Sequence, residues 1–323
     1  MKKTPLHFDQ SLPPVYGTEQ RLSPRITRLL APNPSPFTFR GTGVYLVGDA
    51  KSVTVIDPGP NLPEHVQALL AAIAGRNVSR ILITHTHRDH SPAAAPLKAA
   101  TGAKTYGYGP HAIYFPSGLR IASAATATSP ASAGARGEGG AEFANKVEEG
   151  GDRDFTPDVT VRDGDIIESG ADRFQCVFTP GHTSNHMCYA LDGEKALFTG
   201  DHVMGWSTTV VAPPDGDMGA YMLSLEKLIM RRDRILYPTH GSPILNPGPF
   251  LRAYLSHRRM RETQIARALE RGHDTVPTLV QTLYAGLAPA LIRAATLTVE
   301  AHLKHMVGDG RVAALEDGRF VKL

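Results

Sequence analysis

Residues 84–90 read Thr-His-Thr-His-Arg-Asp-His, which has the form His-x-His-x-Asp-His. The short apolar run 81–83 comes directly before them and predicts a buried strand, so we expect the polar residues on the loop that leaves this strand. Alternate side chains of an extended stretch point the same way, so His85 and His87 can face one ion. Because imidazole and carboxylate groups are ligands of borderline divalent ions, this loop predicts a metal site.

Three later motifs repeat the pattern of a strand-like run followed by a metal-type ligand. The runs and their ligands are 174–178 with His182, 196–198 with Asp201, and 234–237 with His240. Open sheets collect such residues at one edge. The four motifs together offer five histidines and two aspartates, enough for two ions and an open position.

The order and spacing of these motifs resemble the metallo-β-lactamase superfamily. The resemblance implies an α/β fold, the αββα sandwich, and two zinc ions, with manganese or iron as alternatives. It also implies a metal-bridging hydroxide as the nucleophile, with Asp89 orienting it. The implied ligands are His85, His87 and His182 for the first ion, Asp89, His90 and His240 for the second, and Asp201 as the bridge.

Three further residues are candidates for supporting roles. Asp57, in Asp57-Pro58-Gly59, resembles a superfamily turn residue that supports the metal loop, and a plain turn residue is the alternative. His186 follows His182 by four positions and is a candidate catalytic residue, as a supporting donor or leaving-group acid, with a packing role equally open. Trp206 is expected to line the pocket or to lie in the core.

The chain is long enough for a large domain and a small one. We expect a catalytic domain over residues 1–248, with a flexible insertion at about 117–153, and a winged-helix-like domain over 249–323. A first helix is predicted from Asn61, as its cap, towards Gly75. The small domain is predicted to contain helices 250–271, 276–284 and 289–306, then a hairpin of residues 312–315 and 320–323.

The composition of the chain limits which binding partners and which cellular compartment are expected. The net charge is +3, and residues 249–323 carry 9 Arg and 2 Lys against 7 Asp and Glu. The mixed charge of helix 289–306 disfavours sequence-specific DNA binding. Neither a secretory signal nor a membrane span is expected, so a cytoplasmic protein is predicted, with a mature periplasmic form that has lost its signal as the alternative.

The two cysteines, Cys176 and Cys188, are expected to be small core residues in a reducing compartment. The seven histidines without a motif are given no role, and most are expected to lie in solvent. They are His7, His65, His111, His257, His273, His302 and His305.

The metal motifs, residues 34–47 and the C-terminal elements resemble the β-lactamase-like protein 2 family, and residues 200–209 and 213–218 resemble a bacterial subgroup of it. The resemblance implies a binuclear metal-dependent hydrolase, either a single-stranded RNA endoribonuclease or phosphodiesterase, or a hydrolase of small esters, lactones, thioesters or β-lactams. A non-enzymatic protein that binds nucleic acid or a partner, with a structural metal site, is the third hypothesis. A homo-oligomer is left open.

Overall fold

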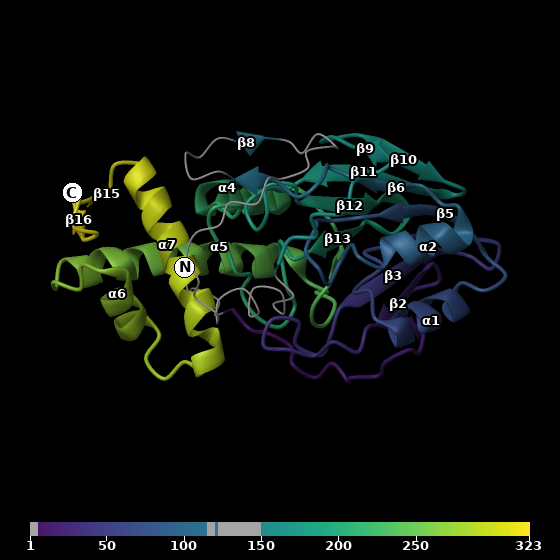
Figure 1. Ribbon diagram of the computed structural model, residues 1–323, viewed down its shortest axis with the longest axis horizontal. Coiled ribbons are helices and arrows are strands. Elements are labelled where there is room, and N and C mark those ends of the chain that lie inside the picture. Colours follow the sequence, from purple (N-terminus) through teal and green to yellow (C-terminus); the bar gives the residue numbers. More distant parts are fainter. Residues whose placement is uncertain (1–5, 115–119, 122–149) are drawn as a thin grey trace, which may run out of the picture. The chain divides into compact units, whose positions relative to one another are not determined.

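The computed structural model describes residues 6–114, 120–121 and 150–323 (Figure 1). Most of the predicted insertion at 117–153 therefore lies outside the described residues. The described chain forms two compact units. The first contains residues 13–161 and 169–171, and the second contains 162–168, 172–323 and the N-terminal residues up to 12.

The first unit is built on a mixed sheet whose inner strands are buried on both faces. Its strands pair in the order β1-β2-β3-β4-β5-β6-β9, antiparallel as far as β4 and parallel from β4 onward. Their bounds are β1 Gln20–Arg21, β2 Ile26–Leu30, β3 Gly43–Gly48, β4 Ser52–Ile56, β5 Asn77–Leu82, β6 Thr105–Gly107 and β9 Val159–Thr160. A separate short pair, β7 Ile113–Tyr114 and β8 Arg120–Ile121, is antiparallel.

Two helices, α1 Pro63–Ala72 and α2 Ala94–Thr101, pack together beside this sheet (Figure 1). Leu69 of α1 and Leu97 of α2 join Val55 and Ile81 of the strands in one buried hydrophobic core. The strand–helix–strand opening expected from the sequence is confirmed. The expected cap is wrong, because the helix begins at Pro63 and no side chain caps it. A proline at the first helical position needs no amide partner and already has a helical φ.

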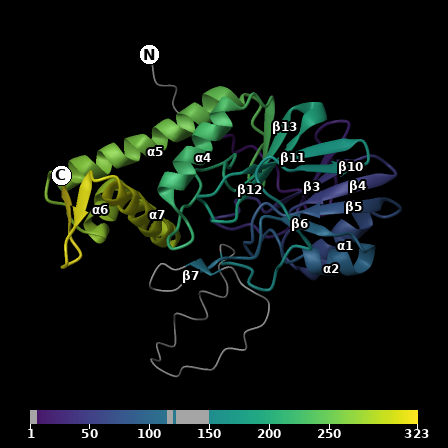
Figure 2. The ribbon, with the colours of Figure 1, turned by 90° about the horizontal axis from the view of Figure 1, so that it is seen from above.

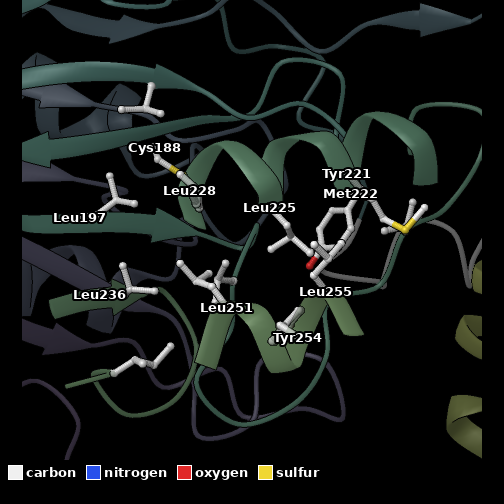
Figure 3. Close-up of a cluster of buried hydrophobic side chains, with 14 of the residues drawn as sticks. Cys188, Leu197, Tyr221, Met222, Leu225, Leu228, Leu236, Leu251, Tyr254 and Leu255 are labelled. Atoms are coloured by element: carbon white, nitrogen blue, oxygen red, sulfur yellow. The ribbon is translucent and has the colours of Figure 1, made fainter. Parts of the chain in front are cut away.

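The second unit contains a sheet of order β10-β11-β12-β13-β14, in which only the last pair is parallel. Its elements are β10 Ile166–Ser169, β11 Asp172–Phe178, β12 Met187–Leu191, the 3-10 turn Asp192–Glu194, β13 Ala196–Gly200 and β14 Ile235–Pro238. Helix α4, Met218–Met230, and helix α5, Pro247–Leu269, lie side by side (Figure 2). Figure 3 shows Leu225 of α4 and Leu251 of α5 packed with Leu197 and Leu236 of the strands.

The C-terminal elements agree with the sequence prediction. After α5 come α6 Val276–Leu283, α7 Pro289–Gly308 and the antiparallel pair β15 Val312–Ala314 and β16 Phe320–Lys322. Ile265 and Leu269 of α5 pack with Leu279 of α6 and Val299 of α7 in a core of their own. Helix α5 thus contributes its first half to one core and its second half to another.

Both cysteines and two of the histidines without a motif are buried in the structure. Cys176 and Cys188 are buried free thiols, as expected, and burial raises the pKa of each to about 12. The expectation of solvated histidines is wrong for His65 and His302, which are 1% and 0% exposed. Within the part of the chain that the structure describes, no helix combines the length and the apolar character needed to cross a membrane.

Candidate metal centre

The first set of candidate ligands lies on the loop that follows β5, as the sequence predicts. Nε2 of His85 is 3.0 Å from Nδ1 of His87, and the ring centroids of His85 and His90 are 4.0 Å apart. Nε2 of His90 lies 3.3 Å from Oδ2 of Asp89. All four side chains are buried. Three imidazoles packed this closely supply nitrogen lone pairs that suit a divalent ion.

Asp57 supports this loop from the end of β4. Its Oδ1 accepts the backbone N–H of Thr84 at 2.7 Å, and its Oδ2 accepts the Thr84 hydroxyl at 2.7 Å. Oδ2 also lies 2.9 Å from Nδ1 of His90. Asp57 has φ +48°, a left-handed conformation that aspartate tolerates better than most residues. The expected contact between Asp57 and the metal loop is confirmed.

Asp89 is held by residues to which the sequence analysis assigned no role. The Thr42 hydroxyl donates to Oδ2 of Asp89 at 3.0 Å and accepts from Nδ2 of Asn33 at 3.0 Å. Oδ1 of Asn33 accepts the Thr42 N–H at 2.9 Å. This buried chain of hydrogen bonds fixes one oxygen of the carboxylate. The only sequence signal for this hydrogen-bonded chain is the position of Thr42, a small polar residue directly before the apolar strand β3.

The second set of candidate ligands lies in the other unit, where His182, Asp201 and His240 follow β11, β13 and β14. Oδ2 of Asp201 is 3.4 Å from Nε2 of His240 and 3.9 Å from Nε2 of His182. All three residues are buried. One carboxylate oxygen facing two imidazole nitrogens is the arrangement expected of a ligand shared between ions.

Two glycines allow these ligand loops to pack tightly. Gly181 has φ +135°, and a Cβ added there would lie 2.3 Å from the backbone Cα of Tyr221. Gly241 has φ +95°, and an added Cβ would lie 2.8 Å from the backbone nitrogen of Trp206. Only glycine combines this backbone conformation with such close approach.

His182 is oriented by a neighbouring loop. Its Nδ1 donates to the Val210 carbonyl at 2.7 Å, which leaves Nε2 as the nitrogen with a lone pair. The Thr209 hydroxyl donates to the Asp201 carbonyl at 2.7 Å, and the Thr209 N–H donates to the Tyr254 hydroxyl at 2.7 Å. The Arg258 guanidinium donates to the Thr209 carbonyl. Tyr254 and Arg258 were not expected to act near the ligands, because they lie on a helix remote in sequence.

His186 and Trp206 occupy different environments. His186 is fully buried, with Nδ1 2.9 Å from the Thr179 hydroxyl. This favours the packing alternative over an acid that meets a leaving group, and the catalytic role stays a prediction. Trp206 is half-buried, and its contact with substrate also stays a prediction.

His202 is fully buried, and burial, followed by the charges of His182 and Arg258, lowers its pKa to about 3.

Comparisons with known proteins agree with this chemistry. Residues 38–240 match the model of the metallo-beta-lactamase superfamily, and residues 275–319 match that of the beta-lactamase associated winged helix domain. The chain therefore belongs to the metallo-β-lactamase superfamily and is a hydrolase. The α/β fold with a C-terminal winged helix is confirmed.

Curated relatives cover nearly the whole chain. An atrochrysone carboxyl ACP thioesterase of Aspergillus chevalieri is 30% identical, over 94% of this chain and 87% of that protein. One of Claviceps purpurea is 28% identical, over 94% and 86%. The lactamase-like protein adaB of Aspergillus niger is 28% identical, over 94% and 86%.

Two solved structures share the fold. A beta-lactamase domain protein from Burkholderia ambifaria superposes with a TM-score of 0.72 at 17% identity, covering 97% of this chain and 96% of that one. A metallo-beta-lactamase family protein from Thermus thermophilus gives 0.69 at 22% identity, covering 94% and 100%.

Proposed function

We propose that this chain is a metal-dependent hydrolase of small-molecule thioesters. The observation that carries the proposal is its similarity, along almost the whole chain, to proteins named as acyl-carrier-protein thioesterases. The thioester is one of the substrates that the motifs alone had left open. The relatives extend through the C-terminal helices, so the proposal covers those helices as well as the ligand loops.

We also propose that the two ligand sets act as one binuclear centre, with His85, His87 and His182 on one ion, Asp89, His90 and His240 on the other, and Asp201 between them. The support is chemical. Each set alone is short of the ligands that two ions need, and both consist of buried imidazoles and carboxylates. Zinc is the first choice because nitrogen and oxygen ligands suit it, with manganese and iron as alternatives.

The roles of the protein's own groups follow from their contacts. Bound divalent ions would supply a water of lowered pKa and positive charge beside a developing oxyanion. Asp57 and the Val210 carbonyl would keep His90 and His182 in the tautomers that present Nε2. Thr42 engages one oxygen of Asp89, so the carboxylate is held in one orientation and can align a nucleophile.

Single-stranded RNA is the second candidate substrate, and the environments of Arg258 and Arg259 do not favour it. Arg258 is buried, and Arg259 pairs with Glu226 at the surface. A groove for RNA needs exposed cations along it. We also infer a cytoplasmic location from the two buried free thiols. The domain boundary expected at 248/249 stays a prediction.

The test is to load the purified protein with zinc and measure metal content and turnover together. The substrates are an acyl-pantetheine thioester, an ester, a lactone, a β-lactam, a phosphodiester and a single-stranded RNA. Asp201→Ala should lose both metal and turnover, whereas Asp154→Ala, at an exposed aspartate, should keep both. Thioester cleavage that depends on Asp201 supports the proposal. Cleavage of RNA or phosphodiester alone would replace it with the nuclease function.

A further inference from the structure

A cavity of about 160 Å³ lies within the second unit, next to the loop that orients His182. One wall is formed by residues 208–210 of that loop. His257, Arg258 and Arg261 of α5 line a second wall. The third wall is largely apolar and includes Leu287, Leu291 and Ala294. The cavity therefore combines three basic groups with a surface suited to carbon chains.

Arg258 is a buried cation without a matching anion. Its side chain lies against the rings of Tyr221 and Tyr254, with its Cζ 5.0 and 5.9 Å from their centroids. Its residue is 2% exposed, and among the described residues it forms no ion pair with a carboxylate. Its Nε is buried without a hydrogen-bond partner. Burying a charge in this way is costly unless a counter-ion arrives.

The other two basic groups have the same incomplete pairing. Arg261 donates to the Leu283 carbonyl at 3.2 Å and lies over the Tyr284 ring at 4.2 Å, but its Nε is buried without a partner. Nδ1 of His257 is likewise buried and unpartnered. The residues that line the cavity include no aspartate or glutamate. Burial, and then the charges of Arg258 and Arg261, lower the pKa of His257 to about 4.

We propose that this cavity is a subsite for an anionic, non-reacting group of the substrate, a carboxylate or a phosphate attached to a carbon chain. Guanidinium groups bind planar and tetrahedral oxyanions through paired hydrogen bonds. The apolar wall would hold the attached carbons. The Val210 carbonyl, in the cavity wall, accepts from His182, so an occupant would lie one hydrogen bond away from a proposed ligand.

The identity of the occupant as part of the substrate rests on the proposed function, whereas anion binding itself does not. The test therefore reads binding without turnover. The zinc-loaded protein is titrated at neutral pH with inorganic phosphate or acetate at constant ionic strength and followed by histidine side-chain NMR, and His257→Gln identifies the His257 signal. Either anion should shift the His257 signal at neutral pH in a saturable way, because this ring lines the cavity that the anion would enter.

Arg261→Gln should increase the anion concentration needed for this shift by about tenfold, the expected loss of one charge-assisted hydrogen bond. Arg267→Gln, an exposed arginine on the same helix, should leave it unchanged. A response to phosphate alone identifies a phosphate-bearing substrate, and a response to acetate alone a carboxylate-bearing one. A His257 signal that does not respond to either anion, or that responds equally in Arg261→Gln, overturns the subsite. If His257 responds while thioester turnover is absent, the subsite stands and the proposed reaction falls.

Discussion

Oδ2 of Asp57 lies 2.9 Å from Nδ1 of His90, at the base of the loop that carries four of the proposed ligands. A carboxylate in this position holds the proton on Nδ1 and increases the basicity of Nε2. The same carboxylate receives the N–H and the hydroxyl of Thr84, so it fixes the start of the loop as well as one of its rings.

Asp57→Asn should therefore weaken metal binding by about 10- to 100-fold, as removal of such supporting groups commonly does. Asparagine tolerates the left-handed backbone of this position, but its amide nitrogen cannot accept from His90 or Thr84. Zinc affinity measured by competition with a chelator is the readout. Asp49→Asn, at an exposed turn, should bind zinc like the parent chain. Equal affinity in Asp57→Asn would show that the contact is not needed to orient His90.

Gly181→Ala should lower the free energy of unfolding by at least about 2 kcal/mol, because the new methyl group meets backbone rather than a movable side chain. Gly193→Ala is the control, since a Cβ there meets nothing within 4 Å. Urea unfolding of both variants measures the difference. If the two variants unfold alike, the approach of Tyr221 to Gly181 is looser than described.

Glu262 should make the free energy of unfolding of the C-terminal elements decrease at low pH. Burial opposes its ionisation, but hydrogen bonds from His302, His305 and Arg311 outweigh burial and lower its pKa to about 2, against 4.5 ordinarily. The stability from this group is thus complete above about pH 4.5 and is lost as the pH falls to about 2. Burial lowers the pKa of His302 from 6.5 to about 4, so protonation of the unfolded chain removes further stability between those values.

Glu262→Gln is expected to cost about 3 kcal/mol of unfolding free energy at neutral pH and to flatten its decline below pH 4.5. Glu226→Gln, which loses only an exposed pair with Arg259, should cost less than about 0.5 kcal/mol. Urea unfolding across a pH series tests both. A Glu262→Gln profile parallel to that of the parent chain would contradict the assignment.

Cys176 and Cys188 should be inert in the folded protein, because burial raises the pKa of both thiols to about 12 and leaves almost no thiolate. A coloured thiol reagent should label neither residue in buffer and both in denaturant. Rapid labelling of the native protein would show that β11 or β12 opens readily.

Much of the fold was predictable because its signals are local. The runs 81–83, 174–178, 196–198 and 234–237 are strand-like and are followed within a few residues by a proposed ligand, and each lies in or directly beside a strand of the structure. The contacts that prepare the site were not predictable in this way. Thr42 reaches Asp89 across 47 positions, and Arg258 reaches Thr209 across 49. A single sequence carries no periodic signal for such pairings.

The cavity lined by His257, Arg258 and Arg261 also depends on long-range contacts that the sequence does not predict. Arg258 and Arg261 lie one helical turn apart, which places them on one face of α5 with Tyr254. In the sequence these two arginines contributed only to the count of basic residues in 249–323. Arg258 is buried because α4 and the loop 208–210 pack against this face of α5, and a single sequence does not reveal that packing.

The two cores that share helix α5 determine where a chimaera between this protein and a relative can be joined. Leu251 and Tyr254 belong to the core beside α4, whereas Ile265 and Leu269 belong to the core of the terminal helices. A chimaera joined at residue 249 would bring in a foreign helix for both cores at once, with mismatches in each. A junction in the turn at Gly272, after the helix has ended, would leave the native α5 in place and limit the mismatch in the core beside α4 to the contribution of Ala301 of α7. Substrate range could then be varied by recombination through α6 and α7 alone, with the arginines of α5 left unchanged.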